Sequence, residues 1–189
     1  MLTQILGFLI EVAVTLVGGA CLLRLYMGWR RMPFNNPVGR FVQALSDWLV
    51  LPLQRLVGRG ARLDVASLLA AWLLKLLQYA ALMTLLGLTR WSVLPLLALL
   101  GVAKLAVSVA TAVVIVAAVL SWMGNRTLVS DLFDRLSAPL LAPIRRWVPL
   151  VGGVDLSPLL LIVALQVLGI VLGSLQASLF GAAALGVIG

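Results

Sequence analysis

The sequence predicts an all-α membrane protein with four transmembrane helices, built as two tandem parallel repeats that each carry an amphipathic cytoplasmic helix at the interface. Three observations predict this fold. The 189 residues are 63% hydrophobic and 11% charged, with a mean hydropathy of +1.17, whereas soluble domains are about 45–50% apolar and about 25% charged. Four segments are apolar over the roughly 20 helical residues that a bilayer requires. The two long segments between them share a residue pattern.

The four expected spans differ in length. The first begins with "MLTQILGFLIEVAV", which has no basic residue and is interrupted by Glu11, so we expect a retained span rather than a cleaved signal peptide. The third and fourth stretches exceed one span, and tilt or an interfacial first turn around Pro95 would absorb the excess. The expected spans run from Leu2 to about Met27, from Val65 to about Thr89, from just after Trp91 to about Met123, and from Ser157 towards Gly189.

Arginine placement predicts the topology. The long segments, 28–64 and 124–156, hold most of the arginines, whereas the short connection between spans two and three has Arg90 alone. Two spans separate the long segments, so both share one face, which the positive-inside rule makes cytoplasmic, with both termini outside. We therefore expect a multi-pass membrane protein whose long segments are cytoplasmic. The arginines of the long segments are Arg30, Arg31, Arg40, Arg55, Arg59, Arg62, Arg126, Arg135, Arg145 and Arg146.

The chain repeats itself with a fixed offset. Asp64 and Asp155 are 91 positions apart (155 − 64 = 91), and the same gapless offset aligns further identical residues. This pattern predicts two units, 1–90 and 91–189, each built as span, cytoplasmic segment and span. Because each unit has two spans, the units share one orientation. The aligned identities include Leu45 with Leu136, Ser46 with Ser137, Pro52 with Pro143 and Arg55 with Arg146.

Each long segment contains an amphipathic helix. Apolar residues recur at helical spacing between 38 and 49 and again between 128 and 140, with polar residues between them. Pro52 and Pro143, with Pro139, are expected to break these helices. Two alternatives remain open at this point. The helices lie in the interface with their arginines towards anionic lipid phosphates, or they dock on the inner end of the bundle.

An aspartate precedes the second span of each unit. In "GGVDLSP", Gly152 and Gly153 permit a sharp turn, and Asp155 or Ser157 can cap the following helix. Asp64 can do the same for span two. Capping matters here because an unsatisfied amide near lipid costs several kcal/mol. The alternative interpretation makes the two aspartates a shared cation or partner site.

At this point the chain resembles a known family. The stretch "LSAPLLAPIRRWVPLVGGVDLSP" is similar to the repeat of the YggT/YlmG family of small integral membrane proteins, and the likeness covers both long segments and the start of the span after each. Unit one departs from it, because "VGRGARLDVAS" lacks the Gly-Gly pair and Ser-Pro. The resemblance implies a four-span protein of a bacterial cell (inner) membrane without known catalysis. It also implies links to osmotic or ionic stress tolerance, or to envelope organisation, division or assembly of membrane complexes.

Three ionisable residues fall inside the expected spans. Such groups are costly in lipid and are candidates for function. Glu11 could pair with Lys104 or with Lys75, and Arg24 is near enough to the inner end to extend its charge to the interface. The residues and the small or polar positions around them fit a bundle interface, a hydrated ion or solute path, or an oligomer interface.

Composition restricts the function classes. Without histidine, and with Cys21 as the sole cysteine, the chain cannot form an intramolecular disulfide, a Ser-His or Cys-His nucleophile pair, or a histidine-bearing metal site. No motif has catalytic spacing, so we expect no enzyme, no catalytic residue, no cofactor and no metal. The net charge of +8 follows the membrane topology, and no nucleic-acid partner is expected.

Two functions remain. The first is a scaffold or assembly factor for membrane or envelope complexes that acts through its amphipathic cytoplasmic segments. The alternative is a component of ion or osmolyte transport that contributes to osmotic stress tolerance. Expected partners are anionic lipids of the cytoplasmic leaflet and unidentified membrane or cytoplasmic proteins, with a homo-oligomer as a further alternative. The candidate functional residues are Glu11, Pro52, Arg55, Asp64, Lys75, Lys104, Pro143, Arg146, Gly152, Gly153, Asp155 and Ser157.

Overall fold

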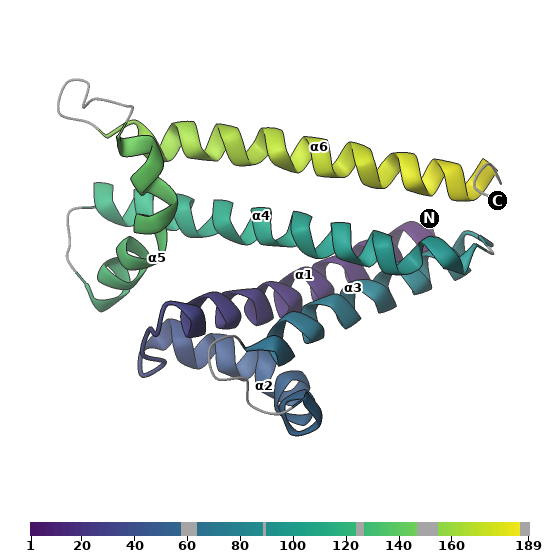
Figure 1. The fold of residues 1–189 in the computed structure, drawn as a ribbon, viewed down its shortest axis with the longest axis horizontal. Helices are drawn as coiled ribbons and strands as arrows, with labels where there is room; N and C mark the ends of the chain where they lie inside the picture. Colours follow the sequence, from purple (N-terminus) through teal and green to yellow (C-terminus); the bar gives the residue numbers. More distant parts are fainter. Residues whose placement is uncertain (58–63, 89, 124–126, 147–154, 186–189) are drawn as a thin grey trace.

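The computed structural model describes residues 1–57, 64–88, 90–123, 127–146 and 155–185, and this part of the chain is helical (Figure 1). Four of its helices are long and apolar enough to cross a membrane. This confirms the predicted all-α class with four spans. The spanning helices are α1 (Leu2–Trp29), α3 (Val65–Leu85), α4 (Leu94–Trp122) and α6 (Ser157–Leu185).

The ends of the spans follow local signals. Helix α3 stops at Leu85, earlier than expected, because Gly87 adopts a left-handed backbone (φ 68°) that ends the helix. Thr89 and residues 186–189, towards which two spans were extended, lie outside the described residues. A short 3₁₀ turn (η1, Trp91–Val93) precedes α4, whose first turn contains a proline. That tilt or an interfacial first turn around Pro95 absorbs the excess length stays a prediction.

Two amphipathic helices connect the spans, α2 (Pro37–Val57) and α5 (Leu128–Arg145). Both have capped starts. The Asn36 side-chain oxygen accepts a hydrogen bond from the Gly39 amide at 2.7 Å. Thr127 and Ser130 exchange side-chain and backbone hydrogen bonds in a capping box. These caps fix where each helix begins after its span.

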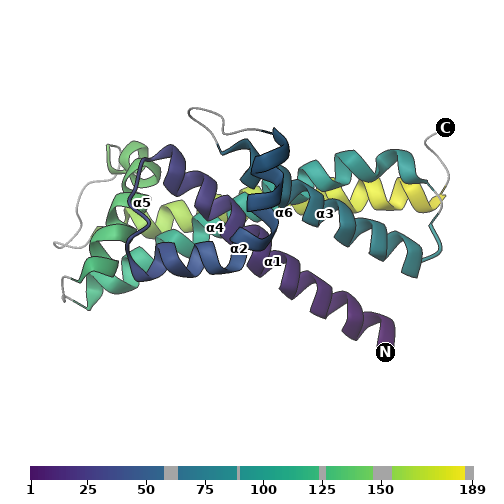
Figure 2. The same ribbon diagram turned by 90° about the horizontal axis from the view of Figure 1, so that it is seen from below.

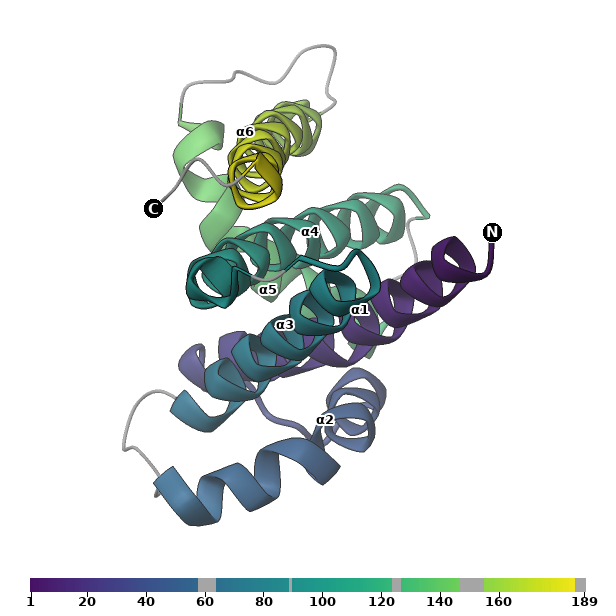
Figure 3. The ribbon, with the colours of Figure 1, turned by 90° about the vertical axis from the view of Figure 1, so that its right-hand side faces the viewer.

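The prolines bend these helices but do not end them. Helix α2 continues through Pro52, and α5 continues through Pro139 and Pro143. The ribbon of α2 bends sharply in Figure 3, and that of α5 in Figure 1. The expectation of broken helices was therefore wrong. A proline removes one backbone hydrogen bond and tilts the preceding turn, while the bonds on either side hold the rest of the helix together.

The helices form two similar units side by side. Helix α1 packs on α3, α4 packs on α6, and the contact between α3 and α4 joins the pairs. Helix α2 packs against α1 and α3, and α5 packs against α4 and α6. Both amphipathic helices lie towards the end opposite the α3–α4 connection and the two termini (Figures 1 and 2). The units thus share one orientation, as the repeat predicts.

Much of the buried interior lies where the units meet. Met27, at the end of α1, packs in one cluster with Leu132 and Leu136 of α5. The Tyr26 hydroxyl donates a hydrogen bond to the Leu136 carbonyl oxygen at 2.8 Å. Helix α2 likewise buries one face, including Val42, against the bundle. Docking of the amphipathic helices on the bundle is therefore confirmed, and their opposite faces stay exposed.

A second bond joins the units nearer the other end. The Gln176 side chain of α6 donates to the Tyr79 hydroxyl of α3 at 2.7 Å, and both side chains are buried. The Tyr79 side chain reaches α6 by passing over Gly101 of α4. A Cβ atom added to Gly101 would lie only 2.7 Å from the Tyr79 ring. The ring also meets Phe180 edge-on, with centroids 5.7 Å apart. Glycine at 101 is thus a packing requirement of this contact.

We expect Gly101→Ala to weaken the contact between the units. The added methyl group would push the Tyr79 ring away from Gln176, and such overpacking costs about 1–3 kcal/mol. Thermal unfolding in detergent measures the loss. Gly7→Ala is the matched control, because a Cβ there meets nothing within 4 Å. Equal melting temperatures for the two variants would contradict this account of Gly101.

Candidate functional site

Asp64 joins three segments of the first unit. Its carboxylate caps α3 by accepting hydrogen bonds from the Ser67 amide at 3.3 Å and the Ser67 hydroxyl at 2.6 Å. It also accepts one from the Gln54 side chain, near the end of α2, at 3.1 Å. The same group therefore starts the second span and ties it to the amphipathic helix. The expected capping role of Asp64 is confirmed.

Asp155 does the same in the second unit. Its carboxylate accepts hydrogen bonds from the Ser157 amide at 2.9 Å and from Arg145 Nε at 2.8 Å. Desolvation alone would raise the pKa of Asp155, but donors on Ser157 and Arg145 outweigh it and hold that pKa below its ordinary value. Gln54 and Arg145 are related by the repeat offset, as are the two aspartates. Each unit thus has one clamp between its amphipathic helix and its second span.

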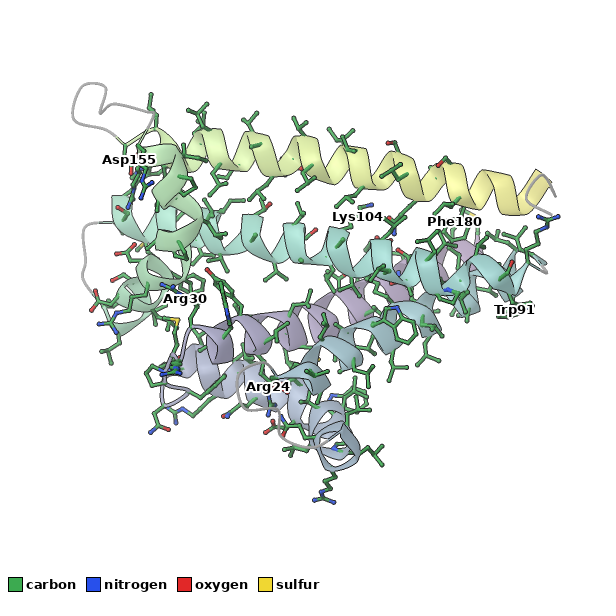
Figure 4. All side chains as sticks on the ribbon, viewed as in Figure 1. Arg24, Arg30, Trp91, Lys104, Asp155 and Phe180 are labelled. Atoms are coloured by element: carbon green, nitrogen blue, oxygen red, sulfur yellow. The ribbon has the colours of Figure 1, made fainter. Side chains whose placement is uncertain are left out.

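Arg24 adds a cation to the first clamp. Its guanidinium forms an ion pair with Asp47 of α2, and its Nε lies 3.4 Å from the Asp64 carboxylate. It also donates to the Ser46 hydroxyl at 3.1 Å. The Arg24 side chain is only 11% exposed. Arg24 therefore extends to carboxylates on α2 and at the start of α3 (Figure 4). That its charge reaches the membrane interface stays a prediction.

The sequence pattern contained a partial signal for this cluster. Arg24 lies within an otherwise apolar span, and Asp47 is an acidic residue next to the buried Ser46 on the amphipathic helix. Gln54 and Arg145 could have been found from the offset that selected the aspartates. Their pairing with Asp64 and Asp155 could not, because the chain between them has to fold back before the side chains meet.

Lys75 is buried inside the bundle. Its ammonium donates a hydrogen bond to the Gln78 side chain, one turn further along α3, at 2.8 Å. Gln78 and Glu11 border a small cavity of about 110 Å³ between α1 and α3. Lys75 thus has a polar partner on its own helix, and that partner lies beside the same cavity as Glu11.

The predicted ion pairs of Glu11 do not form. Among the described residues, no salt bridge joins Glu11 to Lys75 or to Lys104. Both Glu11 and Lys104 lie on exposed faces of their helices. The Lys104 ammonium points towards α6, 3.7 Å from where a Cβ on Gly173 would lie (Figure 4). The charges therefore face different neighbours and do not meet across the bundle.

The other candidates divide between surface and interior. Pro52 and Arg55 are exposed on α2, and Pro143 and Arg146 are exposed at the end of α5. Gly152 and Gly153 lie outside the described residues. Ser157 is buried at the start of α6. In the second unit Arg145 holds Asp155. The repeat offset had instead selected Arg146, as the equivalent of Arg55.

We expect Arg24→Met to destabilise the protein by about 2 kcal/mol, because it leaves the partly buried carboxylates of Asp47 and Asp64 without their cation. Thermal unfolding in detergent measures the change. Arg40→Met is the control, because Arg40 is exposed on α2. Adding Asp47→Asn to Arg24→Met should recover part of the loss. Strictly additive losses in the double variant would count against a coupled cluster.

Comparison with known proteins shows which family the chain belongs to. The family model described as CCB3/YggT matches in two segments, residues 3–85 and 96–176, in keeping with two repeats. The YggT protein of Escherichia coli is 32% identical over 170 residues, which cover 86% of each chain. A Vibrio alginolyticus protein named for the proC 3'region is 30% identical over 174 residues, covering 90% of this chain and 94% of its own. No solved structure matches. With its four spans and two-part match, this chain belongs to the CCB3/YggT family of multi-pass membrane proteins.

Proposed function

We propose that this protein is a non-catalytic scaffold or assembly factor of the bacterial inner membrane, with α2 and α5 at the cytoplasmic face and both termini outside. The observation that carries the proposal is the exposed apolar face of α2. Phe41 is 61% exposed, Trp48 63% and Leu56 82%, although the opposite face of the helix is buried on the bundle. An apolar face at a membrane end suits a partner protein or the lipid interface.

The clamps support this role physically. Helix α2 is held at one end by Gln54 and Asp64 and in its middle by Arg24 and Asp47. A helix fixed in this way presents its outer residues in one orientation, which lowers the entropy that a partner has to remove on binding. The exposed arginines on the amphipathic helices, such as Arg55 and Arg135, would add attraction to anionic lipids.

Burial decides which substitutions test the proposal. Leu136 is wholly buried in α5, so a charge there would disrupt packing and report on folding. Trp48 is exposed, and its indole NH already bonds to the Leu45 carbonyl oxygen of its own helix. Changing Trp48 therefore alters the outer face of α2 while the face buried on the bundle stays as it is.

We expect the double variant Phe41→Glu, Trp48→Glu to insert normally and to lose function. The readouts are the amount of protein in the membrane and growth of a deletion strain after an osmotic upshift. A photoreactive residue at position 45, beside the changed positions, should give a protein adduct in native membranes that the double variant loses. Trp29→Glu is the matched control, because Trp29 is an exposed tryptophan that ends α1. Full complementation by an inserted double variant would refute the scaffold function.

A transport function is the second candidate, and the polar residues around Lys75 favour it. Lys75, Gln78 and Glu11 lie near a small cavity, and the buried Tyr79–Gln176 pair extends the polar region to α6. This function requires that Glu11→Gln or Lys75→Met change ion flux in proteoliposomes. Wild-type protein that gives no flux above protein-free liposomes would eliminate this candidate.

A further inference from the structure

The two units differ at the place that Arg24 fills in the first. Arg24 contacts Ser46, Asp47 and Asp64. The 91-residue offset converts these three partners into Ser137, Ala138 and Asp155. In the first span of each unit the offset is 93 (96 − 3 = 93), because the family match begins at residues 3 and 96 and the spans end at Trp29 and Trp122, so Arg24 corresponds to Ala117. The second unit therefore keeps the aspartate at the start of its second span but has no arginine of its own at the equivalent of position 24.

A cavity occupies that place in the second unit. It has a volume of about 670 Å³, lies between α4, α5 and the start of α6, and is lined by Ser137, Ala138 and Asp155. Its wall on α4 is formed by Ala117 and Ala118, where the first unit has the much larger Arg24 and Leu25. The residues equivalent to the partners of Arg24 thus surround an open space. Small side chains on α4 keep it open.

The charges around this cavity are balanced. Asp134 and Arg135 of α5 line it together with the Arg145–Asp155 pair, which gives two carboxylates and two guanidinium groups. Among the described residues, Asp134 and Arg135 form no side-chain ion pair. Arg145 contacts Asp155 through Nε, and the guanidinium has further N–H donors. A ligand with one cationic and one anionic group would match this set better than an anion alone.

We propose that this cavity binds a phosphate–ammonium zwitterion, the headgroup of phosphatidylethanolamine. Its ammonium group takes the place of the Arg24 guanidinium, donating to Asp155 and Asp134. Its phosphate is bound by Arg135 and Arg145, whose planar groups suit phosphate oxygens. A primary ammonium has the N–H donors that the carboxylates accept, which a choline group lacks. The lipid is the expected source because Trp122, an exposed tryptophan at the end of a span, lies at the cavity rim.

The test is native mass spectrometry of the full-length protein, released from nanodiscs that contain equal amounts of phosphatidylethanolamine and phosphatidylglycerol. We expect preferential retention of phosphatidylethanolamine by the wild-type protein. Asp134→Asn and Arg135→Gln should each reduce that retention roughly tenfold, the effect of losing one charge-assisted hydrogen bond. Asp131→Asn is the matched control, because Asp131 is exposed on the same helix but does not line the cavity.

A second variant tests the comparison of the two units directly. Ala117→Arg places a guanidinium at the equivalent of Arg24, on the α4 wall of the cavity. We expect it to displace the lipid while the protein stays folded, as judged by an unchanged or raised melting temperature. Equal retention of phosphatidylglycerol, or retention of phosphatidylethanolamine by folded Ala117→Arg protein, would overturn the proposal. Soluble phosphorylethanolamine that binds without preferential retention of the lipid would overturn the lipid as the source. None of these outcomes depends on a partner protein, so they are independent of the scaffold test.

Discussion

The structure depends on the aspartate that begins the second span of each unit. A helix that enters lipid has free amides in its first turn, and water cannot satisfy them once the helix is inside. Asp64 and Asp155 accept from those amides and at the same time hold a donor from the preceding amphipathic helix. One carboxylate thus satisfies the start of the span and fixes the helix beneath it. This bond acts together with the apolar packing of α2 and α5 on the spanning helices.

The two units keep this clamp but have diverged around it. In the first, Arg24 closes the space next to Asp64 and pairs with Asp47. In the second, Arg145 holds the aspartate from α5, and small residues leave a cavity where the cation would be. The bonds between the units are asymmetric too, since Tyr79 meets Gln176 and Tyr26 meets the Leu136 carbonyl. The two units therefore share one architecture but differ in the chemistry beside the aspartate.

The ionisable residues inside the spans are held in different ways. Lys75 is buried and satisfied by Gln78 of its own helix, whereas Glu11 and Lys104 are exposed and Lys104 points towards α6. A bundle closed around one internal ion pair would need these groups to converge, and they do not. Helix α6 lies at the edge of the row, where α4 and α5 are its main neighbours. Much of its surface is left for lipid or for another protein.

The sequence by itself determined the class, the number of spans, the repeat and the two aspartates, because hydropathy, helical period and an identical spacing are local or linear properties. It also indicated Pro52 and Pro143 as interruptions, but the bonds on either side of each proline keep these helices continuous and only bent. Only the tertiary structure decided that Arg24 pairs with two carboxylates and that Arg145 rather than Arg146 holds Asp155. It also decided that, in the part of the chain that the structure describes, no salt bridge joins Glu11 to a lysine. These outcomes depend on which helix faces meet. The angle and rotation of each helix set the contacts of these side chains, and no single segment encodes that angle and rotation.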